Sequence, residues 1–165
     1  MRMIHIIPYD GIGGVEAAAR SLPARHFGSI LFEKCFLVQK ASLEAKDHEY
    51  HGRFRSENDP RAYIAAANWI VRRNPEVVIA SLWRSCVVLI LVKLLRPKIR
   101  TVTFLHLDRN VHWFDRILNG LAMRISTEIW ADSQSTLTAR APDRLQRRGR
   151  VISMRTHVLE AETKY

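Results

Sequence analysis

Short apolar runs alternate with longer amphipathic segments along the chain. A short apolar run between chain breakers is typical of a strand that is buried on both faces of a parallel sheet. The runs predicted as strands are residues 3–9, 30–39, 77–80, 100–105, 128–131 and 151–154. The segments predicted as helices lie between them, at residues 15–21, 61–73, 83–95, 111–125 and 133–148. This alternation predicts an α/β fold with a doubly wound, mainly parallel sheet of about six strands and helices on both faces.

Breaker and capping residues set the boundaries of these helices. Asp59 followed by Pro60 is a helix start, and Asn74 followed by Pro75 is a stop. The apolar spacing predicts which side of a helix faces the sheet. In the two amphipathic helices the predicted inward residues are Ile64, Ala67, Ile70 and Val71, and Trp113, Phe114, Ile117, Leu118 and Leu121. Residues 41–58 are polar and predict a loop with a short strand near residues 51–53.

The composition is that of a globular domain with an excess of positive charge. The 165 residues carry 26 Lys and Arg against 16 Asp and Glu, a formal net charge of +10. Hydrophobic residues make up 47%, which excludes a wholly disordered chain. Cys35 and Cys86 are too few for a disulfide framework and are predicted to be buried reduced thiols of a cytoplasmic protein. No apolar run approaches the roughly 20 residues of a membrane span, so any membrane contact would be peripheral, at the inner membrane surface.

Ligands of open parallel sheets bind at the carboxyl ends of the strands, near the switch in strand order. The loops predicted at that edge are residues 8–14, 81–84, 106–110 and 132–134. The first of them carries Gly11, Gly13 and Gly14 just before a helix start. Glycines let a ligand approach the backbone, and a helix N-terminus favours phosphate. These glycines therefore either face a ligand or simply form a tight turn.

Side chains with useful chemistry occupy the other loops. His106 ends a predicted strand, where an imidazole can exchange a proton or bind a ligand at neutral pH, and a structural role is the alternative. Ser81 and Arg84 follow another strand, and Arg84 either holds an anion or is exposed. The remaining candidates, for which a solvated or helix-capping role is the alternative, are Asp108, Arg109 and Ser133.

Common phosphate and metal motifs do not fit the sequence. The dinucleotide fingerprint G-x-G-x-x-G needs a glycine where Glu16 stands, and no acidic ribose partner follows the second predicted strand. There is no G-x-x-x-x-G-K-[ST] motif, which argues against a P-loop nucleoside triphosphatase. His48 and His51 have no companion cysteine or acidic cluster at a metal-ligand spacing. We therefore expect no metal site.

The order of these motifs resembles the N-terminal, acceptor-side domain of GT-B fold glycosyltransferases of family 4, the group 1 transferases. Gly-Gly-x-Glu at residues 13–16 resembles the start of that family's first helix. Residues 75–81 resemble its third β unit, and residues 101–106 resemble the strand that delivers its acceptor-side histidine. Residues 128–133 resemble its next strand, which ends in serine.

The resemblance spans residues 1–158, which we expect to form a Rossmann-like domain, and residues 159–165 would begin a linker or tail. It covers the family's N-terminal half, so the C-terminal donor-binding half is expected to be absent from this chain and supplied in cis or in trans. It implies transfer of a sugar from a nucleotide sugar to a glycan or lipid-linked acceptor, usually with retention, as in polysaccharide biosynthesis. The nucleotide sugar is then a substrate, and no cofactor is implied. A basic face would hold such an enzyme at an anionic membrane surface.

The resemblance also implies roles for single residues. His106 would be the catalytic residue beside the reacting sugar, and Gly13 and Gly14 would approach the donor diphosphate. The side chains on the acceptor side of the cleft would be Glu16, Ser81, Arg84, Asp108, Arg109 and Ser133. Without a donor-binding half, the chain is expected to turn over little or nothing.

Two other function classes stay open. A non-catalytic basic module for nucleic acid or anionic membrane fits the net charge and the basic cluster at residues 144–150. Another nucleotide-binding Rossmann enzyme, an oxidoreductase or a methyltransferase, fits the predicted fold. Steeply salt-dependent binding would mark the first class, and saturable cofactor binding the second.

Overall fold

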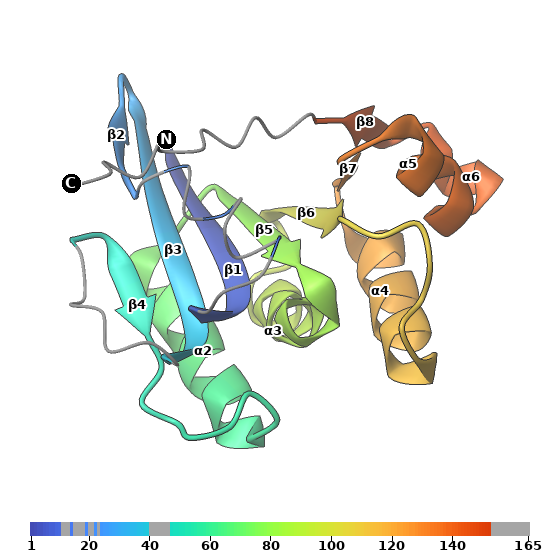
Figure 1. The fold of residues 1–165 in the computed structure, drawn as a ribbon. Coiled ribbons are helices and arrows are strands. Elements are labelled where there is room, and N and C mark those ends of the chain that lie inside the picture. Colours follow the sequence, from blue (N-terminus) through green and yellow to red (C-terminus); the bar gives the residue numbers. More distant parts are fainter. Residues whose placement is uncertain (11–13, 15–18, 20–21, 23, 40–46, 153–165) are drawn as a thin grey trace, which may run out of the picture.

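The computed structural model describes residues 1–10, 14, 19, 22, 24–39 and 47–152 (Figure 1). Its strands are β1 (Arg2–Asp10), β2 (Arg25–Phe27), β3 (Ile30–Gln39), β4 (Glu49–His51), β5 (Val77–Ser81), β6 (Arg100–Leu105), β7 (Glu128–Ala131) and β8 (Gly149–Val151). Its helices are α2 (Pro60–Arg73), α3 (Leu82–Leu95), α4 (Trp113–Ile125), α5 (Gln134–Arg140) and α6 (Asp143–Gln146). From β4 onward helices lie between successive strands, as the hydrophobic pattern predicts, with both α5 and α6 between β7 and β8.

The strands form one sheet in the order β2-β3-β1-β5-β6-β7-β8, with β4 also paired to β3. Every pairing between these strands is parallel except that of β2 with β3. The predicted α/β class with a doubly wound, mainly parallel sheet is therefore confirmed. The eight strands exceed the predicted six because β2 and β4 are short edge pieces with little hydrophobic signal.

Edge pairing explains where the strand predictions differ from the structure. β2 pairs with the start of β3 across a tight turn in which Gly28 has a φ of 58°, a conformation that glycine adopts without strain. β4 covers residues 49–51, whereas the sequence predicts a strand near residues 51–53. The last strand covers residues 149–151 rather than 151–154. These strands are three residues long, so burial alternation could not locate them.

The sheet is buried on both faces. Ile4 and Ile6 of β1 belong to the large core cluster, which lies under α2 and α3 on one face (Figure 1). Ile7 points to the opposite face because side chains alternate along a strand. There it packs with Phe36 and with Ala19, which is helical. Helical residues therefore contact both faces, as predicted.

The ends of α2 are those predicted from its capping residues. The Asp59 side chain accepts a hydrogen bond from the backbone N–H of Arg61 at 2.9 Å, and Pro60 occupies the first turn. The helix ends at Asn74, which has the left-handed φ of 51°. The predicted inward face is wrong at one position: Ile64 is 56% exposed. The buried residues of α2 are Ala62, Ala66, Ala67 and Ile70, so the prediction holds for Ala67 and Ile70, and Val71 is partly buried.

The orientation of α4 contradicts the prediction. The apolar residues predicted to face the sheet are mostly exposed, namely Trp113, Phe114, Ile117 and Leu121. The buried face of α4 instead contains Asp115, Asn119, Ala122 and Met123. The cause is a set of polar partners on α3 and α5, described below, that binds the polar side of the helix.

The predicted thiols and the predicted lack of a membrane span can also be compared with the structure. Cys35 and Cys86 are both free and buried, and burial raises the pKa of each thiol well above its usual range. Among the helices that the structure describes, none is long and apolar enough to cross a bilayer.

Candidate functional site

The strand order places a switch point between β1 and β5. From β1 the chain passes to β3 on one side, and from β5 it passes to β6 on the other. Ligands of open α/β sheets bind outside the carboxyl ends of such a pair. A cavity of about 190 Å³ lies there. Among its lining residues are Tyr9, Trp83, Arg84, His106, His112 and Arg140.

A buried hydrogen-bonded chain underlies this cavity. The Nε2 atom of His5 lies 2.7 Å from the Ser81 hydroxyl, and the same hydroxyl lies 2.9 Å from Nε2 of His106. His5 is 5% exposed and Ser81 is fully buried, whereas His106 lines the cavity. The three residues come from β1, β5 and the end of β6, which are neighbours in the sheet. His106 is therefore anchored from beneath by a serine that the ligand space does not reach.

Burial keeps both histidines neutral at neutral pH. It lowers the pKa of His106 from 6.5 to about 4, and the nearby Asp132 carboxylate opposes this shift. It lowers the pKa of His5 to about 3, and His106 and Lys34 add to that shift. Phe104 supports the His106 ring at 4.2 Å between ring centres. A neutral imidazole in this position can donate one hydrogen bond and accept another.

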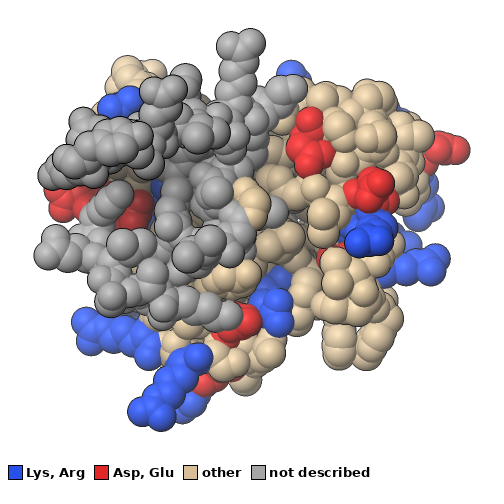
Figure 2. All heavy atoms as spheres, in the orientation of Figure 1, with Lys and Arg blue, Asp and Glu red and all other residues tan. Residues whose placement is uncertain are grey.

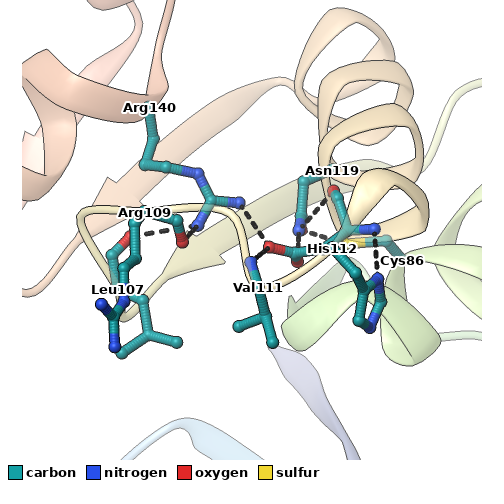
Figure 3. Close-up of polar contacts among 8 residues, drawn as sticks. Cys86, Leu107, Arg109, Val111, His112, Asn119 and Arg140 are labelled. Atoms are coloured by element: carbon teal, nitrogen blue, oxygen red, sulfur yellow. Dashed lines mark hydrogen bonds and ion pairs between the residues drawn. The ribbon is translucent and has the colours of Figure 1, made fainter.

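Arg140 holds the loop that carries His106 toward α4 (Figure 3). Its guanidinium donates to the backbone carbonyls of Leu107 at 3.1 Å and Arg109 at 2.8 Å. It also pairs with the Asp115 carboxylate at 3.4 Å, and both side chains are almost fully buried. The same carboxylate accepts from the backbone N–H of Val111 at 3.0 Å. One buried ion pair thus fixes both ends of the loop beside the cavity.

Asn119 and His112 complete the polar side of α4 that is visible in Figure 3. The Asn119 amide donates to the backbone carbonyl of Asp115 at 2.9 Å, and its oxygen accepts from the Cys86 thiol at 3.2 Å. Nδ1 of His112 accepts from the backbone N–H of Asp115 at 3.2 Å and caps the helix. These bonds explain why the polar side of α4 is turned inward.

The structure brings three of the predicted site residues together. His106 and Arg84 line the cavity, and Ser81 lies directly behind His106. Arg84 donates to the Asn58 side chain at 2.9 Å, and its guanidinium lies 4.3 Å from the centre of the Trp83 ring. Ser81 does not line this cavity, because its side chain is fully buried between the two histidines. Its place on the acceptor side of the cleft stays a prediction.

The other predicted cleft residues lie elsewhere. Asp108 and Arg109 are exposed and do not line the cavity, because Arg140 holds their loop by its backbone. Ser133 is the N-cap of α5, and its hydroxyl accepts from the backbone N–H of Thr136 at 3.1 Å. The structure therefore shows the helix-capping role for Ser133, and lining of the sugar-transfer cleft by these three residues stays a prediction.

The glycine loop is only partly described. Gly13 and Glu16 lie outside the described residues. Gly14 is helical and exposed, and a Cβ added to it would meet no atom of the described residues within 4 Å. The described part of the chain therefore gives no packing reason for glycine at position 14.

His5 is the main site residue that the sequence reasoning missed. It lies inside an apolar strand, and none of its sequence neighbours belongs to a catalytic or binding motif. The role of His5 can be recognised only when the strand pairing is known, because alternation then places His5 on the same face as Ser81.

The backbone between β5 and α3 has an uncommon conformation. Leu82, directly after Ser81, has a φ of 68°, which is uncommon for leucine. Within the described part of the chain, no three His, Cys, Asp or Glu residues are grouped to hold a metal ion.

Comparison with known proteins gives structural matches. No family model matches the chain, and no curated protein sequence matches it. The structure is similar to the UDP-N-acetylglucosamine 2-epimerase from Rickettsia bellii, with a TM-score of 0.62 and 13% identity over 88% of this chain and 43% of that one. It is similar to the apo form of the lipopolysaccharide outer core galactosyltransferase WaaB, with a TM-score of 0.63 and 16% identity over 92% and 45%.

A third similar structure is the UDP-GlcNAc 2-epimerase from Neisseria meningitidis bound to UDP-GlcNAc, with a TM-score of 0.60 and 10% identity over 92% and 45%. At these identities the likeness establishes the fold alone. The chain spans less than half the length of each of these neighbours, two of which are named as UDP-N-acetylglucosamine 2-epimerases and one as a galactosyltransferase. The chain therefore has the Rossmann-like fold of about one half of a GT-B enzyme, and its place in glycosyltransferase family 4 stays a prediction.

Proposed function

We propose that this chain is the acceptor-side half of a glycosyltransferase, which moves a sugar from a nucleotide sugar to a glycan or lipid-linked acceptor. The observation that carries the proposal is His106, a neutral and anchored imidazole that lines a cavity at the switch point of the sheet. The fold shared with a galactosyltransferase supports it. Family 4 membership and retention of the anomeric configuration belong to the same proposal.

The cavity has the size and chemistry of a partial site. Its volume of about 190 Å³ is below the roughly 300–1,000 Å³ of pockets that enclose a whole small ligand. Trp83 offers an aromatic face, and Arg84 and His106 offer hydrogen bonds to sugar or phosphate oxygens. In this proposal Gly13 and Gly14 approach the donor diphosphate, and a donor-binding half completes the cleft in cis or in trans.

A nucleotide-sugar epimerase is the second candidate. It is supported by three structural neighbours with TM-scores of 0.62, 0.59 and 0.60, which are UDP-GlcNAc 2-epimerases. The two candidates share the use of a UDP-sugar and differ in the product. Epimerisation leaves the sugar on the nucleotide, whereas transfer releases the nucleoside diphosphate and extends an acceptor.

The first test uses the chain by itself. Backbone resonances of the isotopically labelled chain are followed while UDP, UDP-glucose, UDP-galactose or UDP-GlcNAc is added. Saturable shifts confined to residues that line the cavity are expected. Equal shifts with a nicotinamide cofactor or a methyl donor, or shifts confined to another part of the sheet, would contradict the proposal.

The second test measures turnover with a donor-binding half present. His106→Ala is expected to lower the transfer rate by about 100-fold or more, which is the range for loss of one hydrogen-bond donor that stabilises charge in the transition state. His26→Ala is the matched control, because His26 is an exposed histidine on β2. Product analysis by mass spectrometry separates transfer from epimerisation. A wild-type rate in His106→Ala would make His106 structural.

The outward face of α4 supports a membrane contact as part of the proposal. Trp113, Phe114, Ile117 and Leu121 are 41–63% exposed, and the exposed Arg116 and Arg124 lie on the same helix. Figure 2 shows the surface over α4 as mainly tan, with Lys and Arg atoms beside it. Aromatic and aliphatic residues mixed with arginine on one helix face are typical of contact with an anionic lipid surface. Nucleic acid is a weaker partner, because Arg148 and Arg150 of the basic cluster are bound to Met123 and Glu128.

A further inference from the structure

A row of polar side chains crosses one face of the sheet over five adjacent strands, from the middle of β3 and β1 to the carboxyl ends of β5, β6 and β7. On this face the row borders an apolar core cluster that contains Phe32, Ile79 and Phe104. The order of strands across the row is β3, β1, β5, β6 and β7. Its members are Lys34, His5, Ser81, His106 and Asp132, the last two directly after their strands.

The pairing register makes this row continuous. His5 is paired with Ile79, and Ser81 lies two residues further along β5 on the same face. Ser81 is paired with Phe104, and His106 lies two residues further on. Each step is therefore a diagonal contact between neighbouring strands, which long side chains can span. The two measured contacts of 2.7 Å and 2.9 Å lie on this diagonal.

The Ser81 hydroxyl restricts the protonation of both rings. A serine hydroxyl has one proton and can accept up to two hydrogen bonds. Among the described residues its hydrogen-bond partners are the two Nε2 atoms, so its proton is used only when it donates to one ring and accepts from the other. Both histidines are neutral at neutral pH, and each neutral ring carries one N–H. The ring that accepts from Ser81 therefore carries its proton on Nδ1, and the ring that donates carries it on Nε2. His5 and His106 must adopt opposite tautomers.

Charges at the two ends of the row favour one direction for this chain. Lys34 is paired with His5 in the strand register and is ion-paired with Glu49 at 3.7 Å. Asp132 acts on His106 from the other end. Hydrogen bonds that donate away from a cation and toward an anion align their dipoles favourably. The favoured order is His5 N–H to Ser81, and Ser81 O–H to His106.

We propose that Ser81 and His5 are positioning residues, which keep His106 in the tautomer with a bare Nε2 and a protonated Nδ1. Because Nε2 is occupied by Ser81, Nδ1 is the ring nitrogen left for a ligand in the cavity. His106 is then a fixed hydrogen-bond donor, and it selects a ligand oxygen such as that of a sugar hydroxyl or a phosphate. The catalytic use of this donor rests on the proposed function, but the tautomer does not.

The test reads the tautomers directly by nuclear magnetic resonance. Ring nitrogens of the ¹⁵N-histidine-labelled chain are observed at pH 7, and their signals are assigned with His5→Gln and His106→Gln. The expected result is one pure tautomer for each ring, with the proton on Nδ1 in His106 and on Nε2 in His5. The same tautomer in both rings, or the opposite assignment, would overturn the proposal.

Two serine variants separate positioning from general packing. Ser81→Ala is expected to move the His106 nitrogen shifts toward the averaged values of the exposed His26, whereas Ser81→Thr, which keeps the hydroxyl, is expected to preserve them. Ser85→Ala is the matched control, because Ser85 is fully buried on α3 and its hydroxyl has no hydrogen-bond partner among the described residues. Unchanged His106 shifts in Ser81→Ala, or equal changes in Ser85→Ala, would contradict the proposal.

Kinetics then distinguish this inference from the proposed function. With a donor-binding half present, Ser81→Ala is expected to lower kcat by about 10- to 100-fold, the range for partners that orient an active histidine. Ser81→Thr is expected to restore most of it. If no sugar is transferred by the wild type, the proposed function fails while the tautomer result still stands. A kcat unchanged by Ser81→Ala, with His106→Ala inactive, would show that positioning is unnecessary.

Discussion

At the scale of single residues, position in a strand proved a better guide than residue type. His106 lines the cavity because it follows β6 at the ligand-binding edge, as its place in the sequence predicts. Ser133 stands at the equivalent edge and instead caps α5. A hydroxyl can serve either role, and only the direction of the backbone N–H groups decides between them. Ser81 shows a third outcome, in which a predicted ligand contact becomes a buried support.

Gly14 allows a residue-scale test of the phosphate role. Gly14→Ala adds a Cβ where no atom lies within 4 Å, so stability is expected to stay equal or rise by roughly 0.5–1 kcal/mol, as for glycine to alanine in a helix. Donor-dependent turnover is expected to fall, because the Cβ occupies space needed by the diphosphate. Gly120→Ala on α4 is the control, since its Cβ also meets no atom. Thermal unfolding and donor KM measure the two effects, and an unchanged KM in Gly14→Ala would rule out the phosphate contact.

At the scale of elements, α4 shows why periodicity locates a helix but does not orient it. The helix has the predicted apolar stripe, but the stripe faces outward. The opposite side is bound by Arg140, whose buried guanidinium meets Asp115. Leaving either charge buried without its partner would cost about 3–5 kcal/mol, which is more than the burial of one large apolar side chain gains. The ion pair and the hydrogen bonds of Asn119 therefore decide which face is inside.

The exposed stripe of α4 gives an element-scale prediction. The double variant Trp113→Ser/Ile117→Ser is expected to weaken binding to phosphatidylglycerol-containing vesicles by roughly tenfold or more, since each residue loses apolar area that the lipid would bury. Arg124→Gln is expected to weaken it about fivefold, from the roughly 1 kcal/mol of one basic residue near an anionic surface. Leu94→Ser/Leu95→Ser, on the exposed end of α3, is the control. Vesicle co-sedimentation measures the binding, and an equal loss in the control would exclude a specific role for α4.

At the scale of the molecule, the sheet brings together titratable groups from distant parts of the chain. His5 and His106 are far apart in the sequence, and both lie within hydrogen-bond distance of one serine hydroxyl. Burial lowers the pKa of both side chains below the ordinary 6.5. Below about pH 6.5 the unfolded chain therefore binds a proton on each histidine before the folded chain does. The stability of the whole fold is therefore linked to pH through these two side chains.

Acid titration tests this linkage. The folded pKa values of about 3 and about 4 lie below the ordinary 6.5, so the unfolded chain binds protons first as pH falls. Stability is expected to be complete well above pH 6.5 and to fall as pH drops from about 6.5 toward about 4 for His106 and about 3 for His5, with a limiting slope of about 1.4 kcal/mol per pH unit for each histidine. His5→Gln is expected to reduce the slope by about half. Urea unfolding at several pH values measures it, and a flat profile in the wild type would contradict the burial of neutral histidines.

The sequence by itself determined the order of the main strands and helices, the ends of α2 and the parallel sheet class. These depend on local hydrophobic runs, capping residues and breakers, which act over a few neighbouring positions. It also located His106 at the edge where ligands bind. The tertiary structure alone decided the short edge strands, the outward face of α4 and the chain from His5 through Ser81 to His106. Each of these depends on partners that are distant in sequence, since register and buried ion pairs are set only when separate strands and helices come together.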